Sequence, residues 1–207
     1  MEQAGKQGQE GLTEGLLEAA EGAGPLLQRD YWGLIRNCKS SPAALMDLVA
    51  TRFGEFAPEE LCVFERSCSP GTPLSHGEEV GVRIPGAGNC QVRVIHRDRQ
   101  SFTLATLPGH PEAGRITFGA YRNDHGDVIF HIRSRARSGS TVMYMGFWTG
   151  GEAMQTNTWT DFVNAVALTA GEGIIGFIHA ETTVMEEQHE SADDVQGPTF
   201  FARGDET

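Results

Sequence analysis

The sequence predicts an α+β fold in which a curved antiparallel sheet wraps around a long C-terminal helix. Short segments with an apolar residue at every second position follow one another between residues 80 and 132, a pattern typical of strands joined by tight turns. A segment with helical apolar spacing precedes them, and another follows them. Strands flanked by helices in this order usually bury one sheet face against a helix.

The first part of the chain predicts a strand and then a helix. An aromatic and aliphatic run predicts a strand over residues 31–37. Ser40-Ser41-Pro42 predicts the start of a helix, because serine caps helices and proline suits the first turn. Gly54 marks its end, and a weaker alternation predicts another strand over residues 61–66. Apolar residues at helical spacing support the helix: Ala44, Leu45, Leu48, Val49 and Phe53.

A meander of five strands is predicted next. Residues 85–89 form a glycine-rich turn between two alternating runs, which predicts a hairpin. Residues 123–127 are polar, contain glycine and predict a second tight turn. The five predicted strands are centred on Val82, Val92 to Val94, Leu104, Phe118 and Phe130.

The last structured part is predicted to be a helix over residues 141–170, split or bent near Gly150-Gly151. One face of its second part carries Gln155, Trp159, Phe162, Val163 and Val166, and we expect that face to be buried. Residues 173–184 are apolar enough for either an additional strand or an ordered arm.

Charge divides the chain into a body and two acidic tails. The 207 residues carry a net charge of −12. Residues 1–28 hold five Glu against one Lys, and residues 181–207 hold eight acidic residues against one Arg. Residues 29–180 are nearly neutral and long enough for one domain. Because the tails are rich in Gly, Gln and acidic residues, we expect both to be disordered.

Several classes of protein are disfavoured by composition and motifs. No apolar run is long enough to cross a membrane, and no basic and apolar leader follows Met1, so we expect a soluble cytoplasmic protein. The acidic balance argues against a nucleic-acid partner. The sequence has neither a Gly-x-Ser-x-Gly elbow nor a phosphate-binding glycine loop, and no cofactor is expected. The four cysteines lack metal or disulfide spacing and are expected to be reduced thiols.

Strand phase assigns side chains to the two sheet faces. The inner set is apolar: Val82, Val92, Val94, Phe102, Leu104, Ile116, Phe118, Val128, Phe130 and Ile132. The outer set is polar: Arg83, Gln91, Arg93, Thr103, Thr117, Tyr121, His131, Arg133 and Arg135. Three interpretations of the outer arginines remain open, namely a solvated face, an anion-binding array and a surface that the acidic tails cover.

A few polar residues share the inner phase, and they define the candidate binding site. They are His96, Thr106 and Ser134 from the strands, joined by Gln155 and Trp159 from the helix. An apolar cavity with a few convergent polar groups is the usual form of a small-molecule site. A filled core whose polar groups are satisfied explains the same pattern.

The loop over residues 107–114 carries the candidate catalytic residues. His110 lies between two prolines, and it is a candidate acid or base with Glu112 or Asp124 orienting it. A shaped hairpin connection explains the same residues. His110, His125 and His131 do not match a metal-ligand spacing, so no metal site is expected.

The run Thr106-Leu107-Pro108-Gly109-His110-Pro111-Glu112, followed by Gly114 and Phe118, resembles an uncharacterised bacterial and plant family known as domain of unknown function 1990. The segment 128–132 before an Arg-Ser stretch is similar too, and the resemblance covers residues 31–170. It implies a helix-grip fold similar to the steroidogenic-acute-regulatory-related lipid-transfer domains and the birch-pollen allergens, whose sheet and long helix enclose a ligand cavity.

The chain departs from the family where Arg115-Ile116-Thr117 stands in place of acidic residues, so a role resting on those acids does not carry over. The family has no established activity. We expect noncatalytic binding of a small, largely apolar molecule near Trp159. The alternatives are a cyclase-type or hydrolase-type enzyme that uses His110 and Glu112, and an interaction domain whose acidic tails recruit a basic protein partner.

Overall fold

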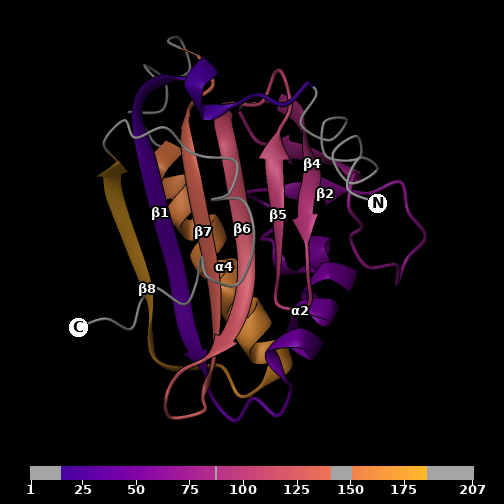
Figure 1. The fold of residues 1–207 in the computed structure, drawn as a ribbon, viewed down its shortest axis with the longest axis vertical. Coiled ribbons are helices and arrows are strands. Elements are labelled where there is room, and N and C mark those ends of the chain that lie inside the picture. Colours follow the sequence, from indigo (N-terminus) through magenta and orange to yellow (C-terminus); the bar gives the residue numbers. More distant parts are fainter. Residues whose placement is uncertain (1–14, 87, 141–150, 186–207) are drawn as a thin grey trace, which may run out of the picture.

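The computed structural model describes residues 15–86, 88–140 and 151–185, and it contains one eight-stranded antiparallel sheet with the order β2-β3-β4-β5-β6-β7-β1-β8 (Figure 1). The strands are β1 (Ala23–Ile35), β2 (Val63–Glu65), β3 (Glu79–Ile84), β4 (Gly88–Arg97), β5 (Ser101–Thr106), β6 (Glu112–Arg122), β7 (Val128–Ser138) and β8 (Ile174–Met185). Helix α4 (Gly151–Ala170) runs along one face, behind β6 and β7 in Figure 1. The predicted α+β architecture is confirmed.

The predicted meander is also confirmed, since β3 to β7 pair consecutively and antiparallel. Helix α2 (Pro42–Thr51) begins as expected, with the Ser41 hydroxyl accepting a hydrogen bond from the Ala44 backbone N–H at 3.2 Å. It ends before Gly54, and a short 3-10 helix, η2 (Phe53–Phe56), continues the chain toward β2.

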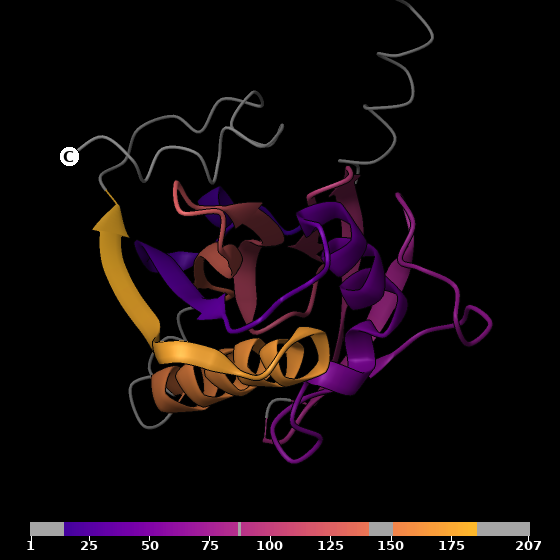
Figure 2. The same ribbon diagram turned by 90° about the horizontal axis from the view of Figure 1, so that it is seen from below.

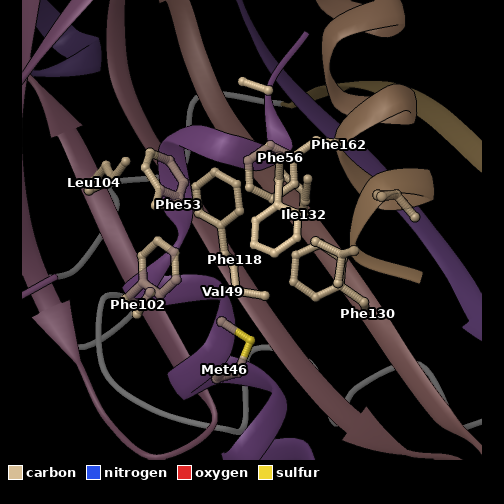
Figure 3. Close-up of a cluster of buried hydrophobic side chains, with 14 of the residues drawn as sticks. Met46, Val49, Phe53, Phe56, Phe102, Leu104, Phe118, Phe130, Ile132 and Phe162 are labelled. Atoms are coloured by element: carbon tan, nitrogen blue, oxygen red, sulfur yellow. The ribbon is translucent and has the colours of Figure 1, made fainter. Parts of the chain in front are cut away.

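The core between the sheet and the helices is rich in phenylalanine. Figure 3 shows the rings of Phe53, Phe118 and Phe162 meeting between α2, η2, α4 and the inner sheet face. The Phe118 ring centroid lies 5.2 Å from that of Phe53 and 5.4 Å from that of Phe162. Edge-to-face and tilted pairs at these distances stabilise a core beyond simple area burial.

Strand phase is confirmed for the inner face, because every residue of the predicted inner set belongs to the core cluster or packs against it. The outer face differs from the expectation near β6 and β7. Thr103, Thr117 and His131 are buried there. The hydroxyls of Thr103 and Thr117 bond each other at 2.9 Å, and the His131 ring packs against the rings of Trp32 and Tyr121.

The N-terminal boundary differs from the expectation. The strand predicted from Tyr31 begins at Ala23, after the 3-10 helix η1 (Ala19–Glu21), so residues 23–28 of the expected tail belong to the sheet. Composition missed this because Gly24, Pro25 and Gln28 are poor strand formers. Pairing on both sides, with β7 and β8, supplies the stability that local propensity lacks.

The C-terminal apolar segment, for which a strand and an ordered arm were both open, is a strand, and it takes in residues 181–185 of the expected acidic tail. In Figure 2 the chain passes from α4 into β8, which pairs with β1 up to Met185. Residues 1–14, 141–150 and 186–207, which include parts of both expected tails and the first part of the expected last helix, lie outside the described residues. Within the described segments, no helix is both long and apolar enough to cross a membrane.

Candidate ligand-binding site

A cavity of about 470 Å³ lies between the sheet and the first half of α4. The β3–β4 hairpin, the β5–β6 loop and the segment before β2 complete its wall. The apolar part of the wall includes Leu61, Cys62, Phe64, Val82, Ile84, Pro85, Val92, Leu104, Pro111, Ile116, Ala136, Met154 and Trp159. A volume of this size accommodates a small organic molecule.

The residue sizes along the strands explain why the cavity is at this end. At one level of the sheet, Phe102, Phe118 and Ile132 lie opposite one another and fill the space under α4. Toward the β5–β6 loop, the inward positions are occupied by smaller residues, including Thr106, Gly114, Ser134 and Ala136. Trp159 marks the boundary, because its ring centroid lies 5.6 Å from that of Phe118 and the residue also lines the cavity.

Most of the candidate residues come together around this cavity. Thr106, Ser134, Gln155 and Trp159 line it, and so do His110 and Glu112 from the loop. The cysteine in the wall, Cys62, is a free thiol whose pKa burial raises to about 12, so it contributes a neutral surface at physiological pH.

His96 does not line the cavity, and its predicted inward position is wrong. A β-bulge between Val94 and His96 shifts the register, so that Val94 lies opposite Leu104 whereas His96 lies opposite the outward Thr103. One extra residue in a strand moves the following side chain to the other face. The His96 imidazole instead contacts the Asp98 carboxylate at 3.3 Å.

Thr106 holds the cavity end of the sheet together. Its hydroxyl oxygen accepts the Gly114 backbone N–H at 2.9 Å and lies 2.9 Å from the Leu17 carbonyl oxygen. Gly114 has a φ of 149°, and a Cβ there would collide with the backbone of β7. The hydroxyl of Thr106 is therefore committed to the protein backbone and not to a ligand.

His110 and Glu112 lie at the same cavity but their side chains have different partners. The Nδ1 atom of His110 lies 3.0 Å from both the backbone nitrogen and the backbone oxygen of Glu112. Burial lowers the pKa of His110 to about 4, so the imidazole is neutral at physiological pH. This geometry fits the interpretation of the loop as a shaped connection.

The Glu112 carboxylate belongs to a buried polar cluster. Arg29, from β1, donates to Glu112 Oε1 at 3.3 Å, and the Gln155 side-chain amide donates to Oε2. Arg29 is 2% exposed and the Glu112 side chain 16%. Burial raises the pKa of Glu112, and the charge of Arg29 and the bonds from Gln155 and Arg29 offset part of that effect.

The sequence did not identify Arg29 as a site residue, because Arg29 lies between the end of the expected tail at residue 28 and the start of the first predicted strand at Tyr31. Once β1 is placed beside β7, the phase argument finds it: Arg29 lies opposite Ser134, and its neighbour Tyr31 lies opposite Ile132 on the inner face. An arginine on an inward phase is the signal that would have located this cluster.

Replacing His110 with Gln is expected to make the protein less sensitive to acid. The folded-state pKa of about 4 lies below the ordinary value of 6.5, so the unfolded chain binds a proton more readily between these values. The stability contributed by the neutral imidazole is therefore present above pH 6.5 and lost as the pH falls toward 4. We expect the wild type to lose on the order of 2–3 kcal/mol more than the variant between pH 7 and pH 4, in urea unfolding at each pH. Equal losses in the two proteins would contradict the burial of His110.

The outward arginines are mostly paired within the protein. Arg133 donates to Asp30, Arg135 to Gln28 at 2.8 Å, and Arg93 to Glu79 at 2.8 Å. These partners fit a structured outer face better than an open anion-binding array.

The imidazole of His131 also contacts Asp30, at 2.7 Å. Burial on its own raises the pKa of Asp30, but the hydrogen bonds from His131 and Arg133 bring it below its ordinary value. In the part of the chain that the structure describes, no three His, Cys, Asp or Glu side chains are grouped as metal ligands would be.

Comparison with known proteins identifies the fold. The model of the family described as "Domain of unknown function (DUF1990)" matches residues 55–165. No curated protein matches the chain significantly.

Among solved structures, norcoclaurine synthase from Thalictrum flavum, in complex with dopamine and hydroxybenzaldehyde, is 9% identical, with a TM-score of 0.51 and coverage of 75% of this chain and 91% of that chain. The hypothetical protein jhp0584 from Helicobacter pylori is 7% identical, with a TM-score of 0.50 and coverage of 68% and 86%. The similarity is one of fold, and it identifies the helix-grip architecture.

Proposed function

The chain belongs to the family described as a domain of unknown function (DUF1990), and from this premise and the cavity we propose that it binds a small, largely apolar molecule between the sheet and the first half of α4, without transforming it. The observation that carries the proposal is the cavity itself, with an apolar wall and a few polar side chains at one end.

Packing supports a cavity that is kept open for a ligand. The rest of the inner face is filled by interlocking phenylalanine rings, as protein interiors normally are. A large apolar void forfeits contacts and destabilises the folded protein, so it is retained where an occupant restores them. The helix-grip enzyme norcoclaurine synthase holds two small aromatic molecules, which supports a similar use of the fold here.

The arrangement of His110 and Glu112 favours binding over catalysis. The Glu112 carboxylate is held by Arg29 and Gln155, whereas His110 contacts the Glu112 backbone. A general acid and a base that act together need their side chains within hydrogen-bond reach of each other or of one substrate atom. Each of these two side chains is already held by hydrogen bonds within the protein.

A substitution that fills the cavity is expected to abolish binding of a neutral apolar probe. Thr158 lies on α4, is 5% exposed and lines the cavity. We expect wild-type protein to bind N-phenyl-1-naphthylamine with an increase in probe fluorescence, and Thr158→Trp to weaken that binding at least tenfold, because the indole occupies the space of the probe.

Thr169→Trp is the matched control. Like Thr158, Thr169 donates its hydroxyl to the carbonyl four residues earlier on α4, at 2.8 Å in both cases, but it is exposed and lies away from the cavity. The control is expected to bind the probe as the wild type does. Failure of the wild type to bind, or equal binding by both variants, would refute the proposed site.

A further inference from the structure

We propose that the polar end of the ligand is an uncharged hydroxyl group, which donates to the Gln155 side-chain oxygen and accepts from the Ser134 hydroxyl. This inference rests on the proposed function and specifies the chemical class of the ligand. It starts from two buried oxygens of the cavity wall, Ser134 Oγ and Gln155 Oε1, which have no hydrogen-bond partner among the described residues.

Ser134 is held at the cavity by the sheet. It is 4% exposed, and its cross-strand neighbours are Ile116 on β6 and Arg29 on β1. A buried hydroxyl without a partner costs about 1–3 kcal/mol in the folded state, and its Oγ–H rotates freely to meet an acceptor. Ser134 therefore offers a donor, and a ligand oxygen beside it removes that cost.

Gln155 offers the complementary acceptor. Its amide nitrogen donates to Glu112 Oε2, which fixes the direction of the amide and leaves Oε1 at its other end without a protein donor. Glu112 is also bonded to Arg29, the cross-strand neighbour of Ser134. This chain of contacts connects Ser134 to Gln155 along the polar part of the wall, and the proposal places one ligand group between them.

The chemistry of that group follows from the two contacts and from the charges behind them. It must donate one hydrogen bond and accept another, which a hydroxyl does with a single oxygen. Arg29 and Glu112 already balance each other's charge, and Arg115, the other charged residue of the wall, has the outward phase of β6. An ionised head group beside Ser134 and Gln155 would therefore add an uncompensated charge in a buried place. An ether lacks the donor, and a hydrocarbon lacks both groups.

Three naphthalene derivatives test the inference, each measured at pH 7.5 by displacement of N-phenyl-1-naphthylamine. They are 2-naphthol, 2-methoxynaphthalene and 2-naphthoate, which share one apolar body and differ in the polar group. We expect 2-naphthol to bind about fivefold more tightly than the ether, as one modest net hydrogen bond predicts, and more tightly than the carboxylate.

Gln155→Met is expected to reduce the ratio of naphthol to ether affinity to about twofold or less, because only the naphthol donates to Gln155. Ser134→Ala removes the donor to both compounds, so it should weaken both by about the same factor and leave the ratio unchanged. A ratio within one protein does not depend on how tightly that protein binds the fluorescent probe. Ser101→Ala is the matched control for Ser134→Ala, because Ser101 is a buried serine at the far end of β5 that bonds Asp98 outside the cavity, and it should leave the affinity for both compounds unchanged.

The outcomes separate this inference from the proposed function. Equal affinity for naphthol and ether in the wild type, preference for naphthoate, a ratio unchanged by Gln155→Met, or naphthol affinity unchanged by Ser134→Ala would overturn the hydroxyl assignment while the apolar cavity still binds the probe. Absence of probe binding in the wild type would overturn the proposed function and the inference with it.

Discussion

Replacing Phe118 with Ala is expected to lower the free energy of unfolding by about 3–5 kcal/mol. Phe118 is fully buried, and its ring contacts those of Phe53, Phe102 and Phe162 as well as Trp159. Removal of this ring leaves a void that neighbouring aromatic side chains fill poorly, because each is held by other contacts. Urea unfolding followed by tryptophan fluorescence measures the change.

The control for this prediction is Arg83→Ala on the opposite phase of the sheet. The Arg83 side chain is 56% exposed, and its contact with Glu65 is long, at 3.9 Å. We expect this change to alter stability by less than about 0.5 kcal/mol. Comparable losses for the two variants would contradict the division of the sheet into a packed inner face and a solvated outer face at these positions.

The second large effect is expected at the buried ion pair of Arg29 and Glu112. Arg29→Met leaves the Glu112 carboxyl buried without its cation and should cost about 3–5 kcal/mol at pH 7.5. The double variant Arg29→Met with Glu112→Gln removes both charges and should recover at least about 1 kcal/mol of that loss, because no uncompensated charge remains. A double-mutant cycle by urea unfolding measures the coupling.

Additive losses would count against the buried pair. If the double variant loses as much as the two single variants together, the two side chains do not stabilise each other, and the charge balance assumed at the polar end of the cavity is wrong.

The periodic parts of the fold were predictable from the sequence because they depend on local patterns. Alternation over residues 80–132 identified the meander and the inner face, and Ser41 with Pro42 identified the start of α2. The same alternation assigned Ser134 and Thr106 to the inner face, and helical spacing assigned Gln155 and Trp159 to the buried face of the helix. Four of the five expected binding residues therefore line one cavity.

The features that the sequence did not predict depend on how segments far apart in the chain pair with one another. The bulge before His96 is one extra residue in a strand, and alternation continued across it assigns the wrong face. β1 begins at Ala23, which pairs with Ser138 on β7, and β8 pairs with β1 from Leu26 onward, although these first residues have tail-like composition. Arg29 became a candidate only when that pairing placed it opposite Ser134.

Titration of N-phenyl-1-naphthylamine into protein with ¹³C-labelled methyl groups tests most directly whether a neutral apolar molecule occupies the cavity. The methyl groups of Leu104, Ile116 and Met154 line the wall, whereas those of Leu168 and Val184 are exposed elsewhere. We expect the largest chemical-shift changes, and transfer of magnetisation from the probe, at the first three. Changes concentrated at Leu168 and Val184, or no changes at all, would contradict a ligand-binding cavity between the sheet and α4.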